Sequence, residues 1–162
     1  DDKNVKWVKT ESTHLTLKFL GEVEETKLDK IVSTLKTVRF EKESVFISKL
    51  GCFPALSNPR VIWAGIFPVN SSDLKIVKLA NNIDKVMHTL KFEKEKRKFN
   101  AHLTLGRAKD KVSDVLKDYI KNNSDIIKLG EFEYKLFTLF KSTLKPTGAE
   151  YTIIEKFCSV EI

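Results

Sequence analysis

The stretch that decides the fold is His14-Leu15-Thr16-Leu17, which recurs 88 residues later as His102-Leu103-Thr104-Leu105. In an extended strand, residues two apart point to the same side of the backbone. Each histidine therefore projects together with its threonine, while the leucines of each motif point the other way, toward a core. The repeat predicts two strands that each present an imidazole and a hydroxyl to a common site.

The elements around the two motifs repeat at the same offset, which is typical of two related lobes. The apolar residues follow a period of two in some stretches and of 3.6 in others. We expect an α+β fold with two pseudo-symmetric lobes, each an antiparallel sheet backed by helices, with a central active-site groove. Ser72 is expected to cap the second helix. The pattern predicts strands at 13–20, 45–50, 61–66, 101–107, 135–144 and 151–160, helices at 24–38, 72–90 and 112–122, a loop at 51–59 and a turn at 145–148.

Length and composition favour one globular domain. The chain has 162 residues, of which 41% are hydrophobic and 31% charged, a balance that excludes a disordered chain. No stretch approaches the roughly 20 apolar residues that span a bilayer, and the first residues lack the apolar core of a signal peptide. Cys52 and Cys158 have no metal or redox spacing and read as small buried hydrophobes of a reducing compartment. We expect a cytoplasmic monomer without a membrane partner.

The charge balance favours a polyanionic partner. The chain carries 29 Lys and Arg against 22 Asp and Glu, a formal net charge of +7, and a positive field attracts RNA. The basic run Lys94, Lys96, Arg97 and Lys98 is either a solvated turn or a contact with an RNA backbone. Charge alone does not decide between these two readings.

Two imidazoles and two hydroxyls suit a phosphodiester. One histidine can take a proton from the attacking oxygen while the other gives one to the leaving oxygen. The hydroxyls of Thr16 and Thr104 can donate hydrogen bonds to non-bridging phosphate oxygens, and Arg107 can add a charge-assisted contact. Two histidines with no evident third ligand make a poor zinc site. We therefore expect no metal and no cofactor.

Two further residues are candidates for the substrate site. Lys18 shares the predicted face of His14 and can line the groove. Phe53, in the predicted loop, can stack on a base, although Phe53 and Trp63 also read as core residues. Taken singly, each histidine is also explained by a structural role, and Arg107 is also explained as a solvent-exposed cation without a function. The repeated threonine partner favours catalysis by the histidine pair.

The sequence resembles the two-histidine phosphoesterase superfamily, and within it the RNA 2′,3′-cyclic phosphodiesterases, historically called 2′-5′ RNA ligases. The resemblance covers nearly the whole chain. Two such motifs with these flanks and in this order are specific, whereas one alone is not. The residues that carry it are Trp7-Val8, His14 to Glu22, Phe53-Pro54, Arg60 to Ile66, Ala101 to Arg107, Ser142-Thr143-Leu144 and Gly148 to Tyr151.

This resemblance implies an enzyme that opens a 2′,3′-cyclic phosphate to leave a 2′-phosphate. It implies that His14 is the acid that protonates the 3′ oxygen and His102 the base that activates water. Thr16, Thr104 and Arg107 would hold the phosphate, without a metal. Members of the family can also join RNA ends weakly through a 2′-5′ bond without ATP. The implied substrates are RNAs with a cyclic phosphate end, tRNA fragments among them.

The chain departs from the family at its start. Members begin with a strand and a helix ahead of the Trp-Val segment, whereas this chain begins almost at Trp7. The internal repeat points the same way, because shifting strand 61–66 and helix 72–90 back by 88 residues places them ahead of residue 1. We expect residues 1–162 to form a single bilobal domain that lacks this N-terminal strand and helix.

Two rival functions stay open. The first is a phosphodiesterase for 2′-5′ oligonucleotides or small cyclic nucleotides. The second is a non-catalytic RNA-binding module that keeps the groove. The intact motifs argue against the second, because binding alone does not need two imidazoles.

Overall fold

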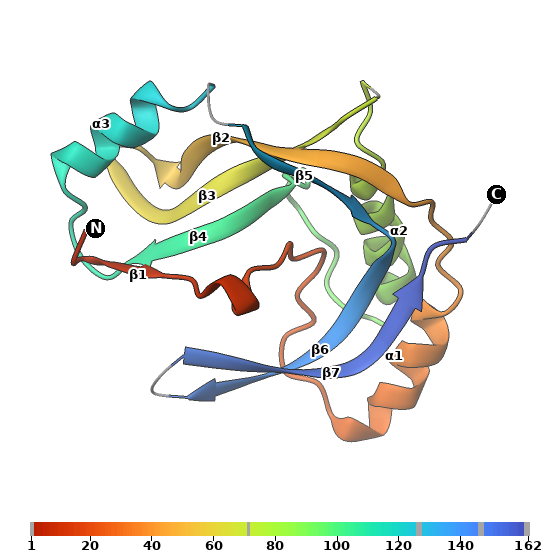
Figure 1. Cartoon of the computed structure of the whole chain (residues 1–162). Helices are drawn as coiled ribbons and strands as arrows, with labels where there is room; N and C mark the ends of the chain where they lie inside the picture. Colours follow the sequence, from red (N-terminus) through yellow and green to blue (C-terminus); the bar gives the residue numbers. More distant parts are fainter. Residues whose placement is uncertain (1, 71, 126–127, 146–147, 161–162) are drawn as a thin grey trace. The chain divides into compact units, whose positions relative to one another are not determined.

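The computed structural model describes residues 2–70, 72–125, 128–145 and 148–160, and in these ranges it has two antiparallel sheets and three α-helices (Figure 1). The predicted α+β class is confirmed. The chain divides into two compact units. The first comprises residues 1–16, 44–72 and 101–132, and the second comprises residues 17–43, 73–100 and 133–162.

None of the described helices is both long and apolar enough to cross a membrane.

The first unit is built on a five-stranded sheet. Its strand order is β1-β4-β3-β2-β5, so the long hairpin of β2 and β3 lies between β4 and β5. The wholly apolar run Val61 to Ile66 forms the middle of β3, which has a hydrogen-bonded neighbour on each side. A continuous apolar run suits such an interior strand. The strands are β1 (Val5–Trp7), β2 (Glu43–Ala55), β3 (Asn58–Pro68), β4 (His102–Ala108) and β5 (Lys128–Tyr134).

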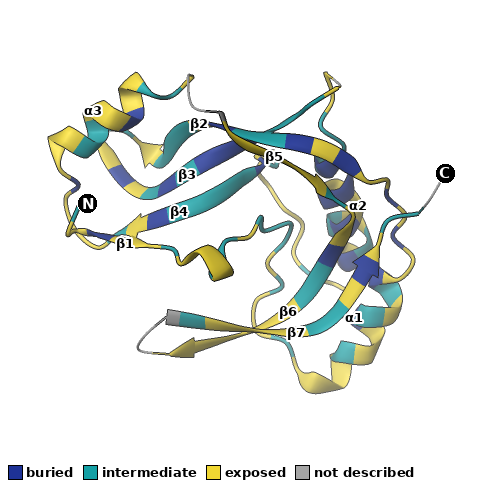
Figure 2. Ribbon diagram, viewed as in Figure 1, coloured by how far each residue is buried: buried dark blue, intermediate teal, exposed yellow. Residues whose placement is uncertain are grey.

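One face of this sheet is covered by α3 (Asp114–Asn122). The core cluster joins Val5 and Ile62 of the sheet to Val112 and Ile120 beside and within the helix, and Figure 2 shows buried stretches along β3, whereas β4 is mostly of intermediate burial. Ser113 caps α3, since its hydroxyl accepts a hydrogen bond from the backbone N–H of Leu116 at 3.3 Å. Because α3 lies on the apolar face, the polar residues of the strands are left on the other face.

The second unit packs two helices with a two-stranded sheet. The helices α1 (Leu28–Leu35) and α2 (Lys75–Thr89) bury their apolar stripes, as amphipathic helices do. The strands β6 (Leu136–Lys145) and β7 (Gly148–Cys158) pair antiparallel, and their rings Phe137 and Phe157 stack with centroids 4.6 Å apart. Phe40 completes this aromatic core at 5.5 Å from Phe137.

A long-range carboxylate, and not Ser72, holds the start of α2. The N-cap residue is Leu74, which has no side-chain hydrogen bond. Instead, the buried carboxylate of Glu43 accepts hydrogen bonds from the backbone N–H of Lys75 at 2.9 and 3.2 Å and from the Tyr134 hydroxyl at 3.0 Å. Burial and the nearby Glu43 charge raise the pKa of Tyr134, so this hydroxyl stays a donor. The Ser72 prediction was wrong because α2 begins at Lys75, so Ser72 precedes the N-cap position by two residues, and an acid 32 residues before Lys75 accepts the first N–H instead.

Several predicted boundaries change. Residues 13–20 form no strand, although they alternate apolar and polar. Alternation predicts an extended backbone, but a strand also needs a partner, and none is assigned to this segment in the described ranges. The predicted loop 51–59 is instead the end of the β2–β3 hairpin, with Pro54 opposite Pro59. Both prolines lie near strand ends, where a missing N–H is tolerated.

Other differences are smaller. The predicted helix 24–38 is a 3-10 turn, Glu25–Lys27, followed by α1. Strand β5 was not predicted as a separate element, and residues 146–147 of the predicted turn lie outside the described residues. Both cysteines are free, but only Cys52 is partly buried, whereas Cys158 is exposed, against the expectation of two buried thiols.

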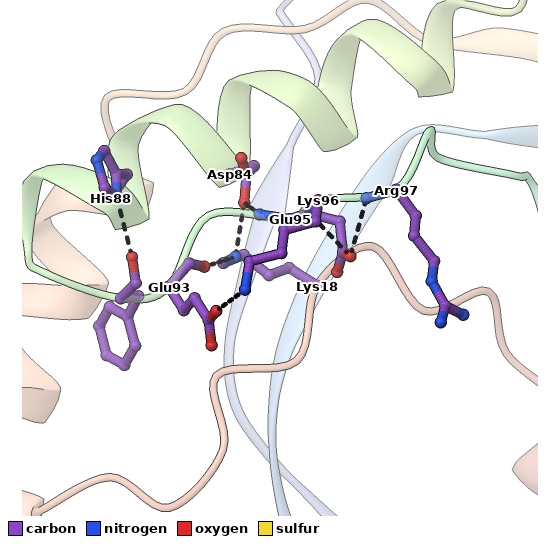
Figure 3. A network of polar contacts seen from close by, with 8 residues as sticks. Lys18, Asp84, His88, Glu93, Glu95, Lys96 and Arg97 are labelled. Carbon is purple, nitrogen blue, oxygen red and sulfur yellow. Dashed lines mark hydrogen bonds and ion pairs between the residues drawn. The ribbon is translucent and has the colours of Figure 1, made fainter.

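A buried ion pair ties the segment after the first motif to α2. The Lys18 ammonium donates to Asp84 Oδ1 at 2.6 Å and to the Glu93 carbonyl at 2.8 Å, and its side chain is 7% exposed (Figure 3). The same Asp84 oxygen accepts the backbone N–H of Glu95 at 3.0 Å. Burial alone would raise the pKa of Asp84, but the hydrogen bonds from Lys18 and Glu95 outweigh it, so this pKa lies below its ordinary value.

Replacing Asp84→Asn should lower the free energy of unfolding at pH 7 by about 3 kcal/mol, because the Lys18 charge is then left buried without its anion. The double variant Lys18→Met, Asp84→Asn should recover part of this loss. Because the Asp84 pKa is depressed in the folded state, the pair stabilises the fold above the unfolded pKa of about 3.9 and loses this effect as pH falls through the lower folded value. Urea unfolding at pH 7 and at pH below about 4 measures both effects.

The matched control is Glu24→Gln, which breaks the exposed Lys27–Glu24 pair of 3.6 Å. An exposed pair contributes about 0.5 kcal/mol or less. Equal losses for Asp84→Asn and Glu24→Gln would contradict the assigned role of the buried pair.

Candidate functional site

The second motif lies on β4, on the sheet face that α3 leaves open. His102 is opposite Gly65 and Thr104 is opposite Trp63 in the antiparallel ladder with β3. The alternate residues Leu103 and Leu105 face the core side, where Leu105 packs on the core cluster. The period of two thus separates the polar pair from the leucines, as the sequence predicts.

A β-bulge brings Arg107 to the same face. Arg107 follows His102 by five residues, an odd spacing that would place it on the opposite face of a regular strand. The register of β4 against β3 shifts between Thr104, opposite Trp63, and Gly106, opposite Ile62. One extra residue in β4 reverses the alternation, as β-bulges do. Gly106 therefore turns toward Val5 in the core, and Arg107 turns outward beside Val61.

Two aromatic rings flank His102. The Phe53 ring lies edge-on to the imidazole with centroids 5.2 Å apart, and the Trp63 ring is 6.2 Å away. Phe53 and Trp63 also contact each other at 5.3 Å. A Cβ on Gly51 would lie 2.2 Å from the Trp63 ring, so only glycine leaves room for it. Because the buried Trp63 Nε1 has no hydrogen-bond partner among the described residues, packing holds this ring in place.

The first motif lies in a loop of the same unit. After β1, which pairs with β4, a 3-10 turn at Thr10–Ser12 leads to His14 and Thr16. The exposed imidazole of His14 holds its Nδ1 at 2.8 Å from the Ser12 carbonyl oxygen. A carbonyl only accepts, so Nδ1 carries the proton in this contact. Thr16 is partly buried.

The structure brings together four of the seven predicted site residues. His102, Thr104, Arg107 and Phe53 lie on one face of the five-stranded sheet, with His14 and Thr16 on a loop of the same unit. Lys18 belongs to the second unit, where Asp84 and the Glu93 carbonyl engage its ammonium. This geometry favours a structural role for Lys18 over the place in the substrate groove that the sequence predicts.

Sequence reasoning missed three contributors to the site. Lys6 is opposite Arg107 in the β1–β4 ladder and adds a second cation to that face. Trp63 reads as core because its strand is wholly apolar, and the Ser12 carbonyl leaves no trace in a side-chain pattern. The odd spacing between His102 and Arg107 was the one available signal of the bulge.

In the ranges that the structure describes, no three His, Cys, Asp or Glu side chains gather as a metal site would require. The expected absence of a metal stays a prediction. The third histidine, His88, lies in α2 and belongs to neither His-x-Thr motif. Its Nδ1 is 3.1 Å from the Phe92 carbonyl oxygen.

Known proteins resemble this chain over most of its length. A protein of Methanocaldococcus jannaschii named RNA 2′,3′-cyclic phosphodiesterase is 38% identical over 157 residues, which cover 96% of this chain and 85% of that protein. One of the same name from Archaeoglobus fulgidus is 36% identical over 156 residues, covering 94% and 83%.

Solved structures share the fold. The crystal structure of TT0787 of Thermus thermophilus matches with a TM-score of 0.78 and 25% identity, covering 96% of this chain and 82% of that one. The structure of LigT of E. coli complexed with 3′-AMP matches in fold with a TM-score of 0.75 at 22% identity, covering 98% and 83%. Residues 1–63 and 66–151 match the model of one family, and the chain therefore belongs to the LigT-like phosphoesterases.

Proposed function

We propose that this protein hydrolyses RNA 2′,3′-cyclic phosphate ends to 2′-phosphates. The observation that carries the proposal is the common face of His102, Thr104 and Arg107, because a base, a neutral donor and a cation there are what a phosphodiester requires. The names of the relatives at 38% and 36% identity support the same reaction. The enzyme class is a phosphodiesterase, with RNA as the substrate class.

In the proposed step, His102 takes a proton from a water molecule, and the water oxygen attacks phosphorus. The bond between phosphorus and the 3′ oxygen breaks, and His14 gives that oxygen a proton from Nε2 as it leaves. The Ser12 carbonyl holds Nδ1–H of His14 and so orients this acid. His102 ends protonated and His14 neutral, and exchange with solvent restores both.

The remaining side chains would hold the phosphate. The hydroxyls of Thr16 and Thr104 donate to non-bridging oxygens, and the Arg107 guanidinium stabilises the charge on them in the transition state. Phe53, which lies edge-on to His102, can support the imidazole or offer its ring to a base. We assign Lys18 to positioning, because its ammonium is already engaged.

Two other activities could use the same pair of histidines. A phosphodiesterase for 2′-5′ oligonucleotides or small cyclic nucleotides would use the same histidines. A weak, ATP-independent 2′-5′ ligation would be the reverse of the same step. A cytoplasmic location and a monomeric state remain predictions. A panel of cyclic mononucleotides, cyclic-ended RNA and 2′-5′ oligomers separates these activities.

The two histidines should differ in their response to the leaving group. Replacing His14→Ala should slow the hydrolysis of cyclic-ended RNA by about 10²–10⁴-fold, because the 3′ alkoxide needs a proton to leave. It should slow an aryl phosphodiester such as bis(4-nitrophenyl) phosphate far less, because a phenolate leaves without one. Replacing His102→Ala should slow both substrates, since water must be activated in each. Steady-state kcat/KM on the two substrates gives the comparison.

The control is His88→Ala, which removes an imidazole held by a backbone carbonyl in α2. It should leave both activities near the wild-type values. Selective rescue of the His102 variant by the aryl substrate would show that the roles are exchanged. Losses below about tenfold for both motif histidines would exclude paired acid–base catalysis.

Activity should survive removal of metals. All proposed charge-stabilising groups are side chains of the protein, so dialysis against EDTA should leave kcat/KM unchanged. The kcat/KM for hydrolysis of cyclic-ended RNA is measured before dialysis, after dialysis, and again after adding Zn²⁺ or Mn²⁺. An activity that is lost with EDTA and returns only with a metal would exclude the two-histidine mechanism.

A further inference from the structure

A hollow of about 400 Å³ lies in the second unit beside the buried Lys18–Asp84 pair. One wall is α2, which contributes Lys85, and another is the segment after α2, which contributes Lys94 and Arg97. Leu17 and Phe99, both partly buried, line it with apolar surface. The hollow therefore combines cations with an apolar surface, and none of these five residues takes part in the proposed chemistry.

The cations of this hollow are available to a ligand. Lys85, Lys94 and Arg97 are exposed, and within the described ranges none of them forms a salt bridge with an acidic side chain, although the charge of Lys94 helps to lower the pKa of Asp84. Figure 3 shows the Arg97 side chain extending away from the polar network, with only its backbone N–H joined to Glu95 at 3.4 Å. By contrast, the neighbouring Lys96 pairs with Glu93 at 2.9 Å.

The net charge of the lining is positive. Lys18 and Asp84, whose side chains are 7% and 13% exposed, neutralise each other at 2.6 Å. The Glu95 carboxylate is the remaining acid of the lining, and it accepts the backbone N–H of Lys96 at 3.2 Å. Three cations therefore face one acid, and a positive concave surface attracts phosphate groups. An adjacent apolar surface suits the ribose and base of a single strand, because such sites combine charge with stacking.

The chain connects this hollow directly to both histidine motifs. Leu17 immediately follows Thr16, and Phe99 precedes His102 by three residues. Since an extended chain spans at most about 3.6 Å per residue, the Cα of Phe99 lies within about 11 Å of that of His102, and the Cα of Arg97 within about 18 Å. Those lengths are covered by a few nucleotides of RNA, whatever the arrangement of the two units.

We propose that this hollow binds the single-stranded RNA chain a few nucleotides away from the cyclic phosphate, with Lys85, Lys94 and Arg97 contacting its phosphates. The proposal rests on the proposed function, since it assigns the body of the same substrate. It makes the protein an enzyme for RNA chains and not only for cyclic mononucleotides. The basic run after α2 thus has a role, but through Lys94 and Arg97 and not through Lys96.

The test compares the salt dependence of kcat/KM for a cyclic-ended dinucleotide and for a cyclic-ended single strand of about ten nucleotides. Each cation that contacts a single strand contributes about 0.7 to the slope of log affinity against log salt. The triple variant Lys85→Ala, Lys94→Ala, Arg97→Ala should reduce the slope for the long substrate by about 2. The slope and kcat for the dinucleotide should not change.

A matched triple variant, Lys30→Ala, Lys78→Ala, Lys109→Ala, removes the same charge from exposed lysines outside the hollow. It should leave the long-substrate slope near the wild-type value. Thermal unfolding of both triples should match the wild type, because all six side chains are exposed.

Equal slopes for both substrates in the wild type would overturn the proposal, as would equal losses of slope in the two triple variants. Competition by an acidic peptide as effective as that by RNA of equal charge would assign the hollow to a protein partner and also overturn it. These outcomes leave hydrolysis of the dinucleotide intact. If the wild type opened no cyclic phosphate at all, the proposed function itself would fail.

Discussion

A single extra residue in β4 determines which side chains can act together. Without the bulge between Thr104 and Gly106, Arg107 would point into the core with the leucines, where a guanidinium cannot be accommodated without a partner. With the bulge, Gly106 takes the core position against Val5, and the small residue is needed because a Cβ there would lie 2.7 Å from the Val5 side chain. The register of β4 therefore sets both the core packing at Gly106 and the presence of Arg107 in the site, and a change in register would alter both.

Asp84 has a comparable role in the second unit. Its one oxygen accepts from Lys18, which follows the first motif, and from the backbone of Glu95, which precedes the second. Within the second unit, one carboxylate thus ties the segment after the first motif and the segment before the second motif to α2. Breaking a buried pair costs more than an exposed pair contributes, because a desolvated charge loses its partner. This internal charge balance explains why Lys18, which shares the periodicity of His14 and Thr16, does not act as a free cation.

The sequence predicted the second half of the site better than the first. The motif at His102 lies in a strand with partners on both sides, so periodicity determines its faces. The motif at His14 shows the same alternation, yet it forms a loop, because pairing depends on neighbours that a local pattern does not contain. The caps differ in the same way. Ser113 directly precedes its helix, so a local sequence pattern could have predicted it as the N-cap. Glu43 caps α2 from a distant segment, which no local pattern can indicate.

The formal charge of +7 says little about where an anion binds, because many of the cations are already partnered. Lys18, Lys96 and Lys117 lie within 2.9 Å of carboxylates, so an RNA phosphate would have to displace an existing partner at each. Lys85, Lys94 and Arg97 require no such exchange, because none of them forms a salt bridge with an acidic side chain in the described ranges, and Lys94 acts on Asp84 only through its charge. A site on these three gains the full counterion release of phosphate binding. Local pairing, more than total charge, therefore determines which basic surface can recognise RNA.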